Sequence, residues 1–165
     1  MNNCLYIICP TDHLEPLVRK WFEGQKYFYT SLGNTLTIDK NTLAQIAITI
    51  NRHNINKITF ILSEENSIVL DALNNQKFST ITGLKESYKS IIEQKREALN
   101  LWNTHNQHTL FLSYYLNQKI KDLQSRLKEH LSNPPNINGK LYSKPYNSFR
   151  NIYSHLICLN AAHIN

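Results

Sequence analysis

The sequence of 165 residues has little of what several protein classes require. Its three cysteines, Cys4, Cys9 and Cys158, are an odd and sparse set, which is typical of free thiols in a reducing compartment rather than of a disulfide framework. Its four glycines are not clustered, so it contains no glycine-rich phosphate-binding loop. No nucleophile-elbow motif marks a serine or cysteine catalytic triad. The common cofactor and nucleophile signatures are therefore missing.

Long apolar runs are also missing. None approaches the ~20 residues that a membrane-spanning helix needs, so we expect no membrane insertion. The first residues, MNNCLYIICPTDH, lack the basic segment and small-residue cleavage site of a secretory signal, and we expect a cytoplasmic protein. A hydrophobic content of 41% and a charged content of 18% are typical of a globular chain.

Positive charge is concentrated in the second half of the chain. Residues 1–76 carry 6 Lys and Arg against 7 Asp and Glu, whereas residues 77–165 carry 12 against 5. A solvated basic helical face accounts for this excess, and a partner of negative charge, either an acidic protein surface or nucleic acid, is the alternative. No arginine-rich run or known nucleic-acid motif supports nucleic acid.

Three short apolar or aromatic segments in the first half predict buried strands, at residues 4–10, 26–31 and 57–63. Helical patterns alternate with them. Asp12 is a candidate cap for the first helix, Asn41 or Thr42 for a second at residues 41–53, and Glu64 and Glu65 open a short third helix at residues 64–76. The alternation of strands and helices predicts a parallel sheet with right-handed crossovers.

The second half contains two long amphipathic stretches. Residues 84–103 and 108–132 each place apolar side chains on one helical face, and HNQH at 105–108 is a candidate link between them. We expect a helical hairpin insertion over about residues 83–132, closed by NPPN and followed by a last strand at 137–143. The prediction is one α/β domain over residues 1–165, with a mostly parallel central sheet of about four strands, flanking helices and this long hairpin. The apolar face predicted for residues 84–103 consists of Leu84, Tyr88, Ile91, Ile92, Ala98, Leu99 and Trp102.

The residues at the strand ends resemble those of the β-class carbonic anhydrases. That family carries C-x-D-x-R after the first strand, R-N-x-G-N after the second and H-x-x-C after the third. Here Cys9 takes the place of the first cysteine, TSLGN at 30–34 keeps Gly33 and Asn34, and SEENS at 63–67 lies where the third motif begins. INGKLYS at 137–143 is similar to the late strand of the family. The resemblance covers roughly residues 4–76 and 136–152.

The resemblance implies a zinc ion held by two cysteine thiolates and one histidine, with an aspartate or a water in the fourth place. Only Cys9 matches this set. The histidine position falls on Glu64 and the second cysteine position on Ser67. Serine is not a usual zinc ligand at neutral pH, so we expect a vestigial site without a catalytic metal.

The Asp–Arg pair of the family is also broken. Without a gap, Thr11 and His13 stand at the two positions; a shift by one residue restores Asp12 but leaves Leu14 where the arginine belongs. Asp12 is then expected to cap a helix, with His13 in its first turn. An altered metal set of Cys9, His13 and Glu64, at the C-terminal edge of the sheet, is the alternative, since ligands of open α/β sheets gather there.

These observations predict a non-catalytic relative of the β-carbonic anhydrases that binds a protein partner or acts as a scaffold and needs no cofactor. The resemblance implies a homodimer, and the basic helices at 84–132 offer a surface for a protein or anionic partner. Two alternatives stay open: a carbonic anhydrase-type metalloenzyme with zinc in an altered ligand set, and nucleic-acid binding through the basic half. The vestigial site comprises Cys9, Asp12, His13, Gly33, Asn34, Glu64 and Ser67.

Overall fold

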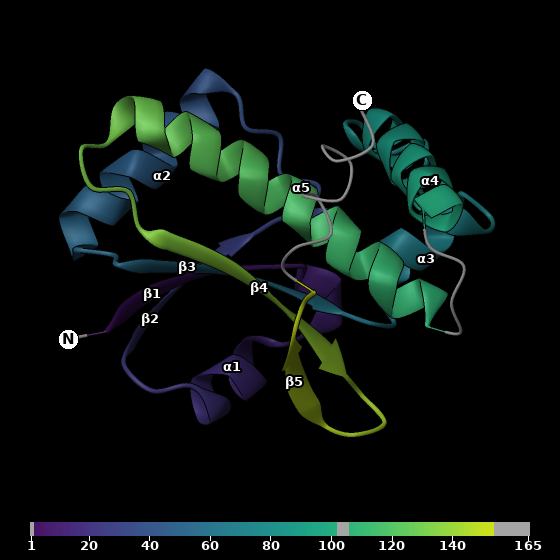
Figure 1. Ribbon diagram of the computed structural model, residues 1–165, viewed down its shortest axis with the longest axis horizontal. Helices are drawn as coiled ribbons and strands as arrows, with labels where there is room; N and C mark the ends of the chain where they lie inside the picture. Colours follow the sequence, from purple (N-terminus) through teal and green to yellow (C-terminus); the bar gives the residue numbers. More distant parts are fainter. Residues whose placement is uncertain (1, 102–105, 154–165) are drawn as a thin grey trace.

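The computed structural model describes residues 2–101 and 106–153 and shows a five-stranded sheet with helices on both faces (Figure 1). The strands lie in the order β2-β1-β3-β4-β5; the first four are parallel, and β5 runs antiparallel to β4. The predicted α/β class and mostly parallel sheet are confirmed. The strands are β1 (Asn3–Ile8), β2 (Gln25–Thr30), β3 (Lys57–Ser63), β4 (Asn136–Ser143) and β5 (Ser148–Asn151).

Helices connect the parallel strands, as the alternation in the sequence predicts. Short 3-10 turns, η1 (Pro10–Asp12) and η2 (Leu32–Asn34), follow β1 and β2. None of the helices within the described residues is long and apolar enough to cross a bilayer. The helices are α1 (Glu15–Trp21), α2 (Lys40–His53), α3 (Ser67–Leu73), α4 (Leu84–Leu101) and α5 (Gln107–His130).

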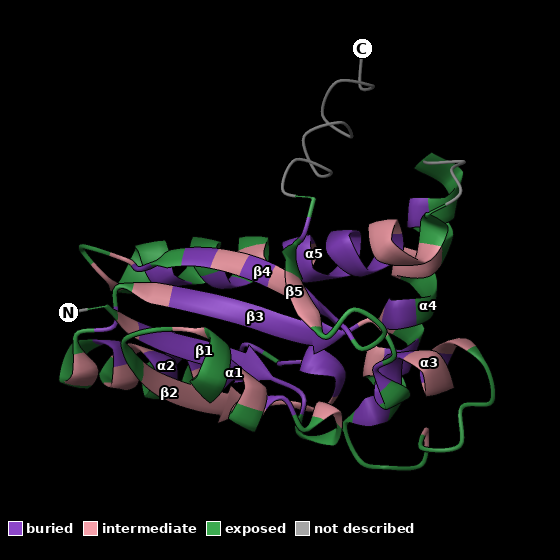
Figure 2. Ribbon diagram, turned by 90° about the horizontal axis from the view of Figure 1, so that it is seen from below, coloured by how far each residue is buried: buried purple, intermediate pink, exposed green. Residues whose placement is uncertain are grey.

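Two apolar clusters hold the helices to the sheet. The larger lies on the face covered by α2, α3, α4 and α5, and includes Ile7 of β1 and Phe60 of β3. The smaller joins α1 to the opposite face through Tyr6 and Val18. Because β1 and β3 are covered on both faces, nearly all their residues are buried, as Figure 2 shows for β3. This explains their continuous apolar sequences.

The described residues form five strands, one more than the approximately four predicted. β5 pairs with β4, so that Phe149 lies opposite Tyr142 in the antiparallel register. Its sequence, SFRN, is short and only partly buried, and it has no apolar run that predicts a strand. Phe149 packs on the α1 side of the sheet against Phe22, with ring centroids 5.1 Å apart.

Three predicted helix starts are wrong. Asp39, not Asn41 or Thr42, caps α2, because its carboxylate accepts a hydrogen bond from the Thr42 backbone N–H at 2.7 Å. The third helix does not open at residues 64 and 65 but at Ser67, capped by Asn66. The residue before α1 is Leu14, whose side chain makes no capping bond. Asp12 has a different role, described below.

Candidate functional site

The residues at the family's motif positions lie at the C-terminal edge of the parallel strands. Cys9 follows β1, Gly33 and Asn34 form η2 after β2, and Ser63 to Ser67 connect β3 to α3. The turns η1 and η2 contact each other and α3. Three chain segments that are distant in sequence therefore meet around the Cys9 side chain.

The Cys9 sulfur is fully buried and occupied by hydrogen bonds. The Gly33 backbone N–H donates to Sγ at 3.0 Å, and the Thr11 hydroxyl lies 3.0 Å from Sγ. Ser67, at the position of the family's second cysteine, donates its hydroxyl hydrogen to Thr11 Oγ1 at 3.1 Å. Thr11 and Ser67 are exposed, so two hydroxyl groups lie between the sulfur and solvent. We call Cys9, Thr11 and Ser67 the hydroxyl cluster.

Gly33 is the backbone support of this cluster. Its φ of +58° lies in the left-handed region, and a Cβ there would come within 2.9 Å of Ile68 Cγ2 on α3. The Tyr115 hydroxyl donates to the Gly33 carbonyl at 2.7 Å from α5. Burial is the main cause of the raised pKa of Tyr115, so this hydroxyl stays protonated and acts as a donor. Beside it, the fully buried Asn34 donates its side-chain amide to the Ile61 carbonyl at 2.9 Å.

Asp12 does not cap a helix, which corrects the prediction. Its carboxylate accepts hydrogen bonds from the Ser63 backbone N–H at 2.8 Å and from Asn66 Nδ2 at 2.7 Å. Asn66 in turn accepts from the Val69 N–H and so caps α3. Burial raises the pKa of Asp12, against the lowering effect of these hydrogen bonds. Asp12 therefore fastens the turn after β1 to the end of β3.

His13 also lies outside its predicted place in the first turn of the helix. It ends η1 in a left-handed conformation with a φ of 52°, and its side chain is exposed. Two further histidines, His105 and His108, lie in the stretch predicted to link the two long helices. His105 lies outside the described residues, and His108 Nε2 is 2.7 Å from the Glu64 carbonyl oxygen.

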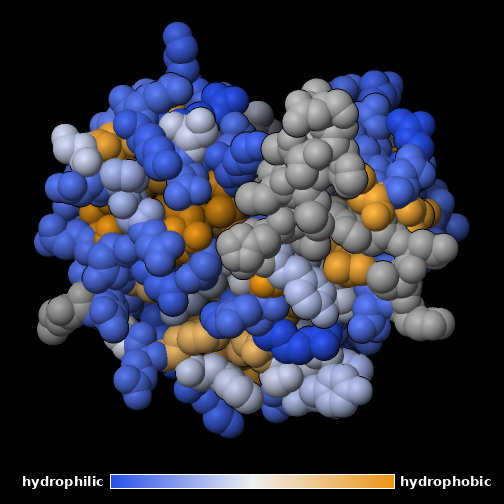
Figure 3. Space-filling view, viewed as in Figure 1, coloured by the Kyte–Doolittle hydropathy of each residue, from blue (hydrophilic) through white to orange (hydrophobic). Residues whose placement is uncertain are grey.

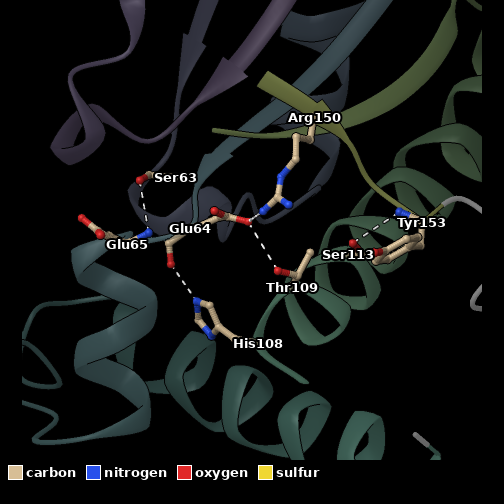
Figure 4. Close-up of polar contacts among 8 residues, drawn as sticks. All are labelled: Ser63, Glu64, Glu65, His108, Thr109, Ser113, Arg150 and Tyr153. Carbon is tan, nitrogen blue, oxygen red and sulfur yellow. Dashed lines mark hydrogen bonds and ion pairs between the residues drawn. The ribbon is translucent and has the colours of Figure 1, made fainter. Parts of the chain in front are cut away.

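Glu64, at the position of the family's zinc-binding histidine, belongs to a separate charged cluster (Figure 4). Its carboxylate forms an ion pair with Arg150 of β5 and accepts a long hydrogen bond, 3.4 Å, from the Thr109 hydroxyl of α5. The Glu64 side chain is only 15% exposed, so Arg150 balances a charge that is largely removed from water. We call Glu64, Thr109 and Arg150 the charged cluster.

The residues at the family's ligand positions do not fit a zinc ion. They supply one thiol bound within the hydroxyl cluster, one carboxylate paired with Arg150, and one hydroxyl. Zinc sites in proteins use thiolates, imidazoles and carboxylates in a tetrahedral set. Over residues 2–101 and 106–153, no three His, Cys, Asp or Glu side chains form a group that could hold a metal, so Cys9, His13 and Glu64 do not form one.

The sequence located the residues at the motif positions but did not reveal their contacts: Cys9, Gly33, Asn34, Glu64 and Ser67. Thr109, Tyr115 and Arg150 were not singled out as site residues, because nothing in their local sequence sets them apart. Arg150 is 86 positions from Glu64 and Tyr115 is 82 positions from Gly33. The one available signal was the pair of hydroxyl residues, Thr11 and Ser67, at positions where the family pattern has an aspartate and a cysteine.

Comparison with known proteins identifies solved structures that have the same fold. No family model and no curated protein matches the sequence. Among solved structures, the β-carbonic anhydrase CafA of Aspergillus fumigatus matches 93% of this chain and 76% of its own, with a TM-score of 0.72 and 14% identity. The Coccomyxa β-carbonic anhydrase, solved with acetazolamide, matches 99% of this chain and 85% of its own, with a TM-score of 0.66 and 12% identity.

A third similar structure comes from a report on two tetrameric β-carbonic anhydrases of Sordaria macrospora. It matches 92% of this chain and 81% of its own, with a TM-score of 0.62 and 13% identity. These similarities cover almost the whole chain at low sequence identity. The chain therefore has a β-carbonic anhydrase-like fold, as the strand-end residues predicted.

Proposed function

We propose that this chain is a non-catalytic, β-carbonic anhydrase-like protein that works in the cytoplasm by binding a protein partner and carries no zinc. The observation that supports this most directly is the hydroxyl cluster. Thr11 contacts the Cys9 sulfur and Ser67 donates to Thr11, at positions where an active family member is expected to supply an aspartate and a second thiolate.

The chemistry of the family explains why this substitution matters. Hydration of carbon dioxide at neutral pH depends on a metal that lowers the pKa of a bound water to ~7. Neither a serine hydroxyl nor a carboxylate already paired with an arginine replaces a thiolate and an imidazole as a zinc ligand. The retained residues, Gly33 and Asn34, have structural contacts instead, since they support Cys9 and β3.

We further propose a homodimer that pairs through the β2 edge of the sheet. β2 is an outermost strand, and its aromatic residues Tyr27, Phe28 and Tyr29 are only partly buried. Together with α2 it lines a hollow of about 420 Å³ in which Ile48 is 62% exposed. Open edges with apolar side chains favour association. Sedimentation of the protein as a monomer at micromolar concentration would contradict the dimer.

Stopped-flow measurement of carbon dioxide hydration tests the catalytic part of this proposal. The purified protein, supplied with zinc during expression, is compared with its Cys9→Ser variant and with buffer. We expect all three rates to be equal. A rate above buffer that disappears in Cys9→Ser would show that the chain is an enzyme with an altered ligand set.

A further inference from the structure

The apolar stripe of α4 is wider than its packing requires. The sequence places seven apolar residues on one face, but only four of the six within the described residues are buried. Ile92 remains 39% exposed and Leu99 remains 38% exposed, although they lie seven positions apart on the same helical face. The apolar surface of α4 is therefore divided into two parts. One part packs against the core, and the other, formed by Ile92 and Leu99, is directed toward solvent.

This second face borders a cavity of about 550 Å³ between the C-terminal end of α3, α4 and the start of α5. Its apolar lining includes Leu70 and Leu73 of α3 as well as Ile92 and Leu99. In Figure 3, hydrophobic side chains reach the surface on the side of the molecule where Figure 1 places α4. The volume falls within the range of roughly 300–1,000 Å³ that is usual for small-molecule sites.

The polar part of the lining has one sign of charge. Lys95 and Arg96 of α4 and His108 of α5 line the cavity, and its described lining contains no carboxylate. The other polar members are the amides Asn74, Gln76 and Asn100. An apolar cavity whose ionisable groups are all basic is complementary to a ligand that is apolar with a negative charge at one end.

Both cations are available to such a ligand. Lys95 lies over the Phe111 ring, 5.2 Å from its centroid, and forms no ion pair within the part of the chain that the structure describes. Arg96 is 3.8 Å from Glu93, but both side chains are about two-thirds exposed or more, at 71% and 67%. Exposed pairs of this kind stabilise little, so Arg96 can exchange Glu93 for a ligand at small cost.

We propose that this cavity, which we call the α3–α4 cavity, binds a carboxylate with a linear apolar chain, such as a fatty acid. The chain lies against Leu73, Ile92 and Leu99, and the carboxylate contacts Lys95 and Arg96. This site lies at the far end of α3 from the hydroxyl cluster and goes beyond the function proposed above. It does not depend on whether Cys9 binds a metal.

Isothermal titration calorimetry of the whole protein tests this proposal with dodecanoate as the probe, below its micelle concentration. We expect saturable binding of one dodecanoate per chain, and no saturable binding of dodecyltrimethylammonium, which has the same chain and the opposite charge, or of acetate, which lacks the chain. Equal binding of both dodecyl probes, or no binding of dodecanoate, would overturn the proposal while leaving the hydration result unaffected.

Paired variants locate the site. Lys95→Glu with Arg96→Glu is expected to weaken dodecanoate binding by about tenfold or more, which corresponds to ~1.4 kcal/mol. The control makes the same change of charge at Lys85 and Lys121, two exposed lysines outside the cavity lining, and should bind as the original protein does.

A second pair tests the apolar contact. Leu99→Asp should abolish saturable binding, whereas Leu101→Asp should not, because Leu101 is 40% exposed on the same helix but does not line the cavity. Both residues are partly exposed, so neither change removes core packing. An equal loss in the two variants of either pair would mean that dodecanoate binds without a defined site, and would overturn the proposal.

Discussion

The hydroxyl cluster and the charged cluster lie at the same edge of the sheet but are held by different forces. Cys9, Thr11 and Ser67 are joined by hydrogen bonds through two hydroxyl groups, whereas Glu64 and Arg150 form an ion pair. The resemblance to carbonic anhydrases assigns Cys9, Glu64 and Ser67 to one metal cage. In this chain Cys9 and Ser67 both contact Thr11, whereas Glu64 pairs with Arg150, so the three positions are divided between two clusters.

Restoring the missing ligands gives the largest expected effect. Glu64→His together with Ser67→Cys would supply two thiols and one imidazole at the positions that the resemblance assigns to zinc. We expect this variant to bind one zinc ion per chain with an affinity far above that of the original protein, because the donor set then matches that of structural and catalytic zinc sites.

The matched control for this gain is Glu64→Gln with Ser67→Ala, which disrupts the same contacts without adding a ligand. Metal content after dialysis against a chelator distinguishes the two. If the control and the restored variant retain equal amounts of zinc, the positions do not converge on Cys9, and the division between the two clusters has been assigned wrongly.

An intermediate effect separates the two clusters by their response to salt. Arg150→Met leaves the Glu64 carboxylate without its partner, and Thr11→Val removes a hydroxyl from the hydroxyl cluster while keeping the shape of the side chain. Arg150→Met should lower the free energy of unfolding by about 2 kcal/mol or more, because it leaves a largely buried charge unbalanced. Thr11→Val should lower it by about 1 kcal/mol. Only the loss from Arg150→Met should become smaller at high salt, since added ions screen charged partners.

Urea denaturation at low and high ionic strength measures both losses. Because Arg150 pairs with Glu64, whereas Thr11 contacts Cys9 and Ser67, the double variant should lose the sum of the two single losses. A strong coupling between them would mean that the two clusters form one network, contrary to the comparison above.

The smallest effect concerns Asp12, which joins the turn after β1 to the start of α3. Burial raises the pKa of Asp12 in the folded protein above its value in the unfolded chain. Protonation of Asp12 therefore stabilises the folded state, and this stabilisation is lost as the pH rises through the pKa of the folded protein. The stability of the original protein relative to Asp12→Asn should therefore increase as the pH falls from about 7 toward about 4.

Urea denaturation of both proteins at each pH gives the difference between their free energies of unfolding. The pH dependence of the groups that the two proteins share cancels in this difference. A difference that shrinks toward acid pH would indicate a lowered pKa, in which case the hydrogen bonds from Ser63 and Asn66 outweigh burial.

The buried strands were predictable because burial on both faces of a parallel sheet requires a continuous apolar sequence. β1 and β3 show this, whereas β5 was missed because four residues at an edge need no such pattern. Most helices were predictable from the spacing of their apolar residues. The apolar face of α4 was predicted as one surface. Ile92 and Leu99 lie beyond the part that the core covers, and this extent depends on the position of α3.

The positions of the site residues were predictable, but their contacts were not. Cys9, Gly33, Glu64 and Ser67 were found from their places after the strands. The partners of Asp12 are 51 and 54 positions away, so local sequence could only suggest a helix cap. Contacts between segments this distant depend on the register of the sheet, which a single sequence does not specify.

The central claim is that the residues around Cys9 do not hold zinc. Competition of the unmodified protein against a chromophoric zinc chelator, alongside Cys9→Ser, measures this directly. We expect weak zinc binding that is the same in both proteins. Tight binding of one zinc ion per chain, lost in Cys9→Ser, would contradict it.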